Sequence, residues 1–191
     1  MRDTKELQVV PGSLKAIADA TGQDVMNVLM GVEAIVLLDQ SGSMGIHDAR
    51  GGRSRFAAAD EELRKLQELH PGKIALVEFS DRAQFCPGGL PSRMGRGTNM
   101  IAPLEWVTAA GADGIFDVIM VSDGEPDEEN RTIEFARRMK GPIHTIHIGR
   151  ENGDGADFLR RLAAATGGRR FEADKPGELG AGVIALLGAG D

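Results

Sequence analysis

The chain has 191 residues, which is enough for one domain with a sizeable core. Hydrophobic residues make up 41% and charged residues 27%, and the net charge of −7 argues against a general attraction to nucleic acid or to an anionic membrane. No apolar run approaches the ~20 residues of a membrane span, and MRDTKELQVVPGSLK lacks the apolar region of a secretory signal. The single cysteine, Cys86, cannot form an internal disulfide, so we expect a cytoplasmic protein in which Cys86 is a small buried side chain or a loop thiol.

Residues 1–31 are expected to form an N-terminal helical extension, ahead of a main domain at residues 32–191. In SLKAIADATGQDVMNVLMG the apolar residues follow a broken helical spacing: Leu14, Ile17, Val25, Val28 and Leu29. This spacing predicts one or two short helices. They would either pack on the domain or be offered to a partner, and we favour packing.

From residue 32 onward, strand-like apolar runs alternate with helical patterns. The expected strands lie at 32–39, 73–80, 82–86, 115–123, 143–149 and 169–173. The expected helices lie at 55–70, 98–111, 127–141, 156–168 and 178–190. Four details are also expected: an apolar face that includes Leu69, a bend at Pro103, acids in the first turn and bases in the last turn of 127–141, and an antiparallel edge strand at 82–86.

This order of elements predicts an α/β fold with three layers. The sheet is doubly wound and mostly parallel, with helices on both faces and one short antiparallel edge strand. In such folds, ligands bind beyond the carboxyl ends of the strands. We therefore searched the segments that follow each strand for residues that carry chemistry.

Oxygen-bearing side chains gather in three of these segments. DQSGSMG places Asp39, Ser41 and Ser43 directly after the first strand, and VSDGEPDEEN places Asp123 after the third long strand. GRGTNM places Thr98 at the start of the helix between them. The set contains no His or Cys at metal-ligand spacing, and hard oxygen ligands suit Mg²⁺, Ca²⁺ or Mn²⁺ rather than zinc or copper.

Together, DQSGS, Thr98 in GRGTN and Asp123 in VSDGEPD resemble the metal-ion-dependent adhesion site of von Willebrand factor type A domains. The motif of that family is Asp-x-Ser-x-Ser, followed by a distant Thr and a distant Asp. The resemblance covers residues 31–191 and indicates the prokaryotic, intracellular type. It implies that Ser41, Ser43 and Thr98 bind Mg²⁺ (with Mn²⁺ or Ca²⁺ as alternatives) through their hydroxyls. It also implies that Asp39 and Asp123 bind the ion directly or through water.

Other interpretations of DQSGSMG are an ordinary polar turn and a catalytic site. A nucleophile elbow needs Gly-x-Ser-x-Gly, and the first glycine is missing around Ser43. A base would have to come from His144 or His147, which lie within a predicted strand. Phosphatases that begin with Asp-x-Asp need an acid at position 41, where this chain has Ser41.

The polar residues around the motif have simpler interpretations. Ser122 and Glu125 are expected to flank the loop after Asp123, and Asp127 is expected to be the N-cap of the next helix. His47 and Asp48 are expected in a solvated loop beside the metal, where they could influence the choice of partner.

The resemblance implies a Mg²⁺-dependent protein–protein interaction module rather than an enzyme. An Asp or Glu of a partner protein would complete the metal coordination, and neither nucleic acid nor membrane is expected as a partner. Bacterial stand-alone domains of this kind resemble adaptors of AAA+ ATPases or parts of stress-response complexes. Two alternatives stay open: a metal-dependent hydrolase that uses the same Asp, Ser and Thr residues, and a structural module in which the metal only rigidifies the loops.

Overall fold

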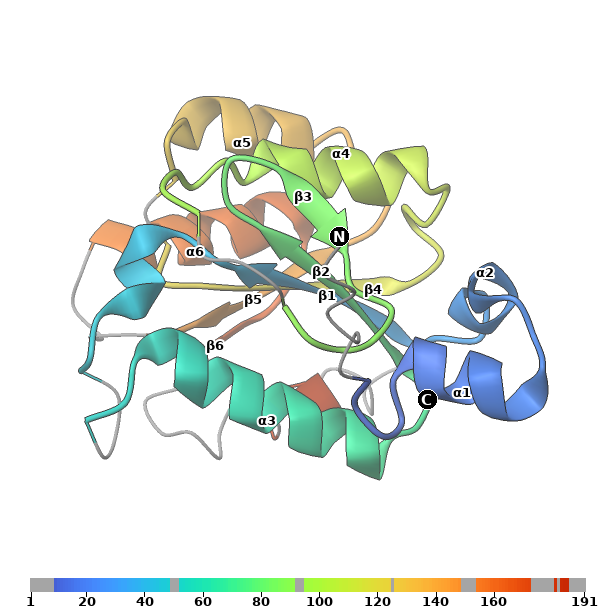
Figure 1. Ribbon diagram of the computed structural model, residues 1–191. Helices are drawn as coiled ribbons and strands as arrows, with labels where there is room; N and C mark the ends of the chain where they lie inside the picture. The colour runs from blue at the N-terminus through green and yellow to red at the C-terminus, as the bar shows by residue number, and fades with distance from the viewer. Residues whose placement is uncertain are drawn as a thin grey trace, which may run out of the picture.

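The computed structural model describes residues 9–48, 52–91, 95–124, 126–148, 154–172, 181 and 183–185. Its centre is a six-stranded sheet with the order β3-β2-β1-β4-β5-β6 (Figure 1). The strands are β1 Ala34–Asp39, β2 Ile74–Phe79, β3 Ala83–Phe85, β4 Asp117–Ser122, β5 Ile143–His147 and β6 Arg170–Glu172. All neighbouring pairs are parallel except β2 and β3, which confirms the mostly parallel sheet and its short antiparallel edge strand.

Helices cover both faces of the sheet, as the alternating pattern predicts. They are α1 Leu14–Thr21, α2 Val25–Leu29, α3 Arg55–Leu69, α4 Ile101–Ala109, α5 Glu129–Ala136 and α6 Asp154–Thr166. Helix α3 lies on one face, and α4, α5 and α6 lie on the other (Figure 1). None of the helices in the described ranges is long and apolar enough to cross a membrane.

Side chains of the central strands alternate between two hydrophobic cores. In β1, Ile35 and Leu37 belong to the core that includes α4, α5 and α6, whereas Val36 and Leu38 belong to the core under α3. Every residue of β1 is buried. A strand buried on both faces fits the continuous apolar run from which it was predicted.

The two N-terminal helices pack against the domain. Leu14 and Leu29 belong to the core on the α4 side of the sheet. Two backbone bonds hold the start of α1 and the segment before it to the loop after β3: Val10 N–H donates to the Gly88 carbonyl at 2.9 Å, and Lys15 N–H in α1 donates to the Pro87 carbonyl at 2.8 Å. The prediction that these helices pack on the domain is confirmed, and the boundary at residue 31 stays a prediction.

Several details of the predicted helices are wrong. Leu69 is 71% exposed, because α3 ends there. Pro103 is the third residue of α4, where its missing N–H costs no helical hydrogen bond, and the bend expected there stays a prediction. Helix α5 ends at Ala136, so the following bases lie outside its last turn. Most of the expected helix at 178–190 falls outside the described residues, although residues 181 and 183–185 are helical.

Candidate metal centre

The centre is built where β1 and β4 end side by side. These strands are parallel neighbours in the middle of the sheet, so their carboxyl ends meet at one edge. Asp39 is the last residue of β1 and Ser122 is the last residue of β4. The Ser122 hydroxyl donates to Asp39 Oδ2 at 2.5 Å, and this bond joins the two strand ends. Ser122, which the sequence suggested only as a flanking residue, therefore positions a candidate ligand.

A short 3₁₀ turn, η1 at Gly42–Gly45, holds the two serines beside Asp39. The backbone N–H of Ser41 donates to Asp39 Oδ1 at 2.7 Å, and the hydroxyls of Ser41 and Ser43 are 3.0 Å apart. Met44 within this turn is fully buried in the core under α3. Packing of the Met44 side chain in this core therefore fixes the turn that carries Ser43 next to Asp39.

Thr98 comes to the same edge on the loop that precedes α4. Gly95 N–H on this loop donates to the Gln40 carbonyl at 2.7 Å, which ties the loop to the residue after Asp39. The Thr98 N–H donates to Asp127 Oδ2 at 3.0 Å, and Asp127 N–H donates back to the Thr98 carbonyl at 3.1 Å. Asp127 therefore connects this loop to the one after β4. It is not the N-cap of α5, because Glu128 occupies that position.

Asp39 is strongly perturbed by its surroundings. Burial raises the pKa of the Asp39 carboxyl from 3.8 to about 6, although hydrogen bonds from Ser122 and Ser41 act in the opposite direction. The nearby charge of Asp123 adds a smaller raising effect. A buried carboxylate next to a second carboxylate is costly when both are ionised, and a cation between them would relieve that cost.

Asp123 has one engaged oxygen and one free oxygen. Its Oδ2 accepts a hydrogen bond from Arg55 Nη1 at 2.9 Å. Its Oδ1 is buried and has no hydrogen-bond partner among the residues that the structure describes. An unpaired buried carboxylate oxygen is unfavourable, and it fits a position that faces a bound cation.

Arg55, like Ser122, contributes to the centre in a way that was not predicted from the sequence. Its Nε and Nη2 donate to Asp48 Oδ1 and Oδ2 at 2.9 and 2.7 Å, and these bonds help to raise the pKa of the guanidinium. Asp48 is therefore paired with Arg55, while His47 and Asp48 both lie in an exposed stretch, as the sequence predicted. One signal was available: Arg55 follows the N-cap Ser54, at a helix N-terminus where the dipole disfavours a cation.

The assembled residues fit a hard divalent cation. The structure brings Asp39, Ser41 and Ser43 into direct contact, with Asp123 close enough to influence Asp39, and places the loop of Thr98 against both strand ends. No group of three or more His, Cys, Asp or Glu that could hold a metal occurs among the described residues, so any ion here depends on hydroxyl ligands. The roles of these five residues as ligands stay a prediction.

The two histidines considered as possible bases lie at different ends of β5, Ile143–His147. His144 Nδ1 accepts a hydrogen bond from Arg169 N–H at 3.1 Å, and its Nε2 lies 3.9 Å from Asp117 Oδ1. Asp117 begins β4, at the edge of the sheet opposite the candidate centre. His144 therefore lies away from Ser43, whereas His147 is buried at the carboxyl end of β5, in register with Ser122.

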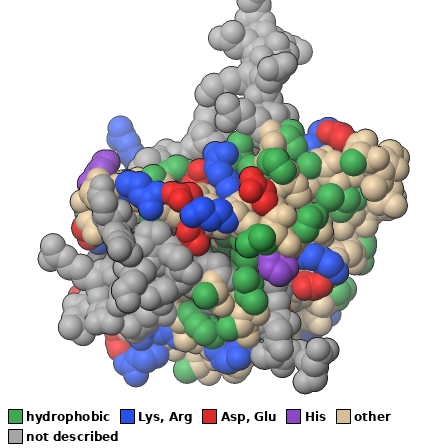
Figure 2. Space-filling model, turned by 90° about the horizontal axis from the view of Figure 1, so that it is seen from below, with side chains coloured by type: hydrophobic (Ala, Val, Ile, Leu, Met, Phe, Trp, Pro, Cys, Tyr) green, Lys and Arg blue, Asp and Glu red, His purple; other side chains and the backbone are tan. Residues whose placement is uncertain are grey.

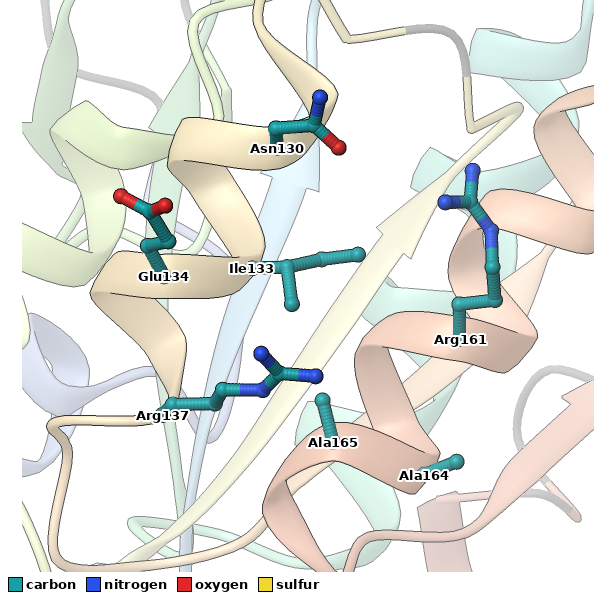
Figure 3. Close-up of a pocket in the computed structure, with 7 residues that line it drawn as sticks. All are labelled: Asn130, Ile133, Glu134, Arg137, Arg161, Ala164 and Ala165. Atoms are coloured by element: carbon teal, nitrogen blue, oxygen red, sulfur yellow. The ribbon is translucent and has the colours of Figure 1, made fainter.

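Other surface features lie apart from the centre. A groove of about 590 Å³ runs between α5 and α6, where Ile133 and Arg137 extend from the α5 side toward Ala165 on α6 (Figure 3). None of its lining residues belongs to the centre. On the α3 side, acidic and basic side chains are interleaved (Figure 2), with ion pairs such as Arg64–Asp60. This described part of the surface therefore differs from the basic patches that bind nucleic acid.

The class of protein that this geometry defines is a doubly wound α/β domain with an oxygen-rich loop cluster at the carboxyl edge of its sheet. No protein-family model matches the sequence. Solved structures do share the fold. One is an aerotolerance-related membrane protein of Bacteroides fragilis, with a TM-score of 0.66 and 16% identity, covering 83% of this chain and 99% of that chain.

Two further structures have similar scores. The manganese-loaded TRAP protein of Plasmodium vivax has a TM-score of 0.59 and 16% identity, covering 83% of this chain and 74% of that one. A von Willebrand factor type A protein of Catenulispora acidiphila has a TM-score of 0.58 and 18% identity, covering 81% of this chain and 41% of that one. The chain therefore has the fold of the von Willebrand factor type A domain, as the sequence resemblance predicted.

Proposed function

We propose that this protein is a Mg²⁺-dependent protein–protein interaction module. The ion would be held by Asp39, Ser41, Ser43, Thr98 and Asp123. The observation that carries the proposal is the meeting of two buried carboxylates and a pair of serine hydroxyls at one strand edge, where Asp123 Oδ1 is buried without a described partner. The TRAP protein, which shares the fold and is manganese-loaded, supports the binding of a divalent ion by this fold. Mn²⁺ and Ca²⁺ are the alternatives to Mg²⁺.

The expected ligand of the loaded centre is an Asp or Glu of a partner protein. When bound, the ion would supply a local positive charge that attracts a carboxylate. Next to the loop of Thr98 lies a hollow of about 460 Å³ whose lining carries more acidic than basic side chains: Asp81, Glu105, Asp127, Glu128 and Arg131. Because these carboxylates would repel an acidic group, we expect binding of such a partner to depend strongly on the cation.

Two further properties of the protein belong to this proposal, its cellular location and its role as an adaptor rather than an enzyme. We place the protein in the cytoplasm, as an adaptor for an AAA+ ATPase or a stress-response complex, without nucleic-acid or membrane partners. We infer that it is not an enzyme. A metal-dependent hydrolase is the alternative, and it would be favoured by Mg²⁺-dependent turnover of a generic phosphate or ester substrate that Asp39→Ala abolishes.

The test is an affinity capture from a lysate of the native source, with the tagged chain in Mg²⁺, in chelator, and as the Asp39→Ala variant. We expect a partner that is retained only by the wild-type chain in Mg²⁺. Asp19→Ala, which removes an exposed carboxylate paired with Lys15, is the matched control and should retain the partner. Circular dichroism should show that both variants are folded. Equal capture in all conditions would contradict the proposal.

A further inference from the structure

Arg55 occupies a position that helix electrostatics disfavour. It is the first residue of α3, after the N-cap Ser54, whose hydroxyl accepts a bond from Ala57 N–H at 3.1 Å. A cation in the first turn faces the positive end of the helix dipole. The guanidinium therefore needs negative charge from elsewhere in the chain, and it receives it from Asp48 and Asp123.

These two carboxylates hold the guanidinium in one orientation. Asp48 accepts two bonds, at 2.9 and 2.7 Å, in the side-on geometry that matches the planar fork of arginine. Nη1 then reaches Asp123 Oδ2 at 2.9 Å. The side chains of Arg55 and Asp123 are only 12% and 3% exposed, so solvent screens their pairing weakly. The bond occupies one oxygen of Asp123 and leaves Oδ1 as the oxygen that can face an ion.

Arg55 also changes the charge of the whole network. Asp39, Asp48 and Asp123 contribute three negative charges when ionised, and Arg55 contributes one positive charge. A divalent ion would make this network neutral. Without Arg55 the loaded network would keep one negative charge, which would repel an incoming carboxylate.

We propose that Arg55 sets the balance between two affinities of the metal centre. It weakens binding of the cation alone, and it strengthens binding of a carboxylate to the cation-loaded centre. The proposal rests on the proposed function, that a divalent ion binds at this edge. A residue that only stabilised the fold would move both affinities in the same direction, whereas Arg55 is expected to move them in opposite directions.

The test uses Mn²⁺ as the probe ion with the full chain, followed by electron paramagnetic resonance of free Mn²⁺. The variants are Arg55→Met, Arg55→Gln and Arg55→Lys. The control is Arg64→Met, which breaks an ion pair with Asp60 on the same helix. Relative to wild type, we expect Arg55→Met and Arg55→Gln to bind Mn²⁺ about ten-fold more tightly. Arg55→Lys, which keeps the charge, should stay within about three-fold, and Arg64→Met should be unchanged.

Acetate is then titrated into the Mn²⁺-loaded proteins, and solvent proton relaxation reports its arrival. We expect half-saturation at lower acetate concentration in wild type and Arg55→Lys than in Arg55→Met and Arg55→Gln. If the neutral variants bind Mn²⁺ as wild type does or more weakly, or bind acetate equally well, the role of Arg55 is refuted while the metal centre stands. If wild type itself binds no Mn²⁺, the metal centre is refuted, and the role of Arg55 with it.

Discussion

The buried carboxyl of Asp39 should make the stability of the metal-free protein depend on pH. The pKa of Asp39 is about 6 in the folded chain, whereas an unperturbed Asp side chain, as in the unfolded chain, has a pKa of 3.8. The folded state therefore binds the proton more tightly than the unfolded state. Proton binding by Asp39 therefore stabilises the folded state fully below pH 3.8, and this stabilisation is lost as the pH rises through about 6. Its full size is about 3 kcal/mol.

Urea denaturation in chelator at pH 5 and pH 7.5 measures this effect. Between these pH values the Asp39 contribution falls by about 1.4 kcal/mol, which corresponds to about 3–6 °C in the melting temperature of a chain of this size. Asp39→Asn is the matched control, since an amide of the same shape does not titrate. Other groups titrate in both proteins, so the difference between their pH dependences isolates Asp39. Identical pH dependence in the two proteins would refute the reasoning.

Three further outcomes are expected from the fold. Gly124→Ala should lower the free energy of unfolding by about 2–4 kcal/mol, because φ is +87° and a Cβ would lie 2.1 Å from a carbonyl oxygen of α6. The control Gly111→Ala, at φ +69° with open space around the new Cβ, should cost less. Equal losses of stability in urea denaturation would contradict this prediction. Burial raises the pKa of the Cys86 thiol to about 12, so the native protein at pH 8 should react with iodoacetamide far more slowly than the denatured protein. Equal reaction rates would contradict this prediction, because they would show an accessible thiolate. Leu66→Ala should cost about 2–5 kcal/mol and Leu69→Ala less than about 0.5 kcal/mol, because Leu66 is buried and Leu69 is exposed, and similar losses would contradict this difference.

The sheet could be predicted from sequence because its central strands are continuous apolar runs. A continuous apolar run such as the one that forms β1 is typical of a strand buried on both faces in the middle of a parallel sheet, and every residue of β1 is buried. The helix ends were less predictable. Helix α5 ends at Ala136, although the pattern predicts a helix as far as residue 141. Leu69 continues the apolar spacing of α3 but is exposed, since spacing alone does not say which side chains find a packing partner.

The residues of the candidate centre were found because they follow strands whose carboxyl ends share an edge. Arg55 and Ser122 were missed as contributors, because their roles depend on contacts between distant segments. The bond from Arg55 to Asp123 spans 68 residues, and the one from Ser122 to Asp39 spans 83. Periodicity and local motifs carry no information about such pairs, although a cation at a helix N-terminus is a local signal that can be read.

We propose that a divalent ion binds where Asp39, Ser41, Ser43, Thr98 and Asp123 converge. Anomalous diffraction from a crystal grown with Mn²⁺ tests it most directly. The expected result is one strong anomalous peak within about 2.0–2.4 Å of oxygens from these residues, absent in crystals of Asp39→Ala. A crystal of the wild-type chain with no peak at this edge, or with the same peak in Asp39→Ala, would contradict the claim.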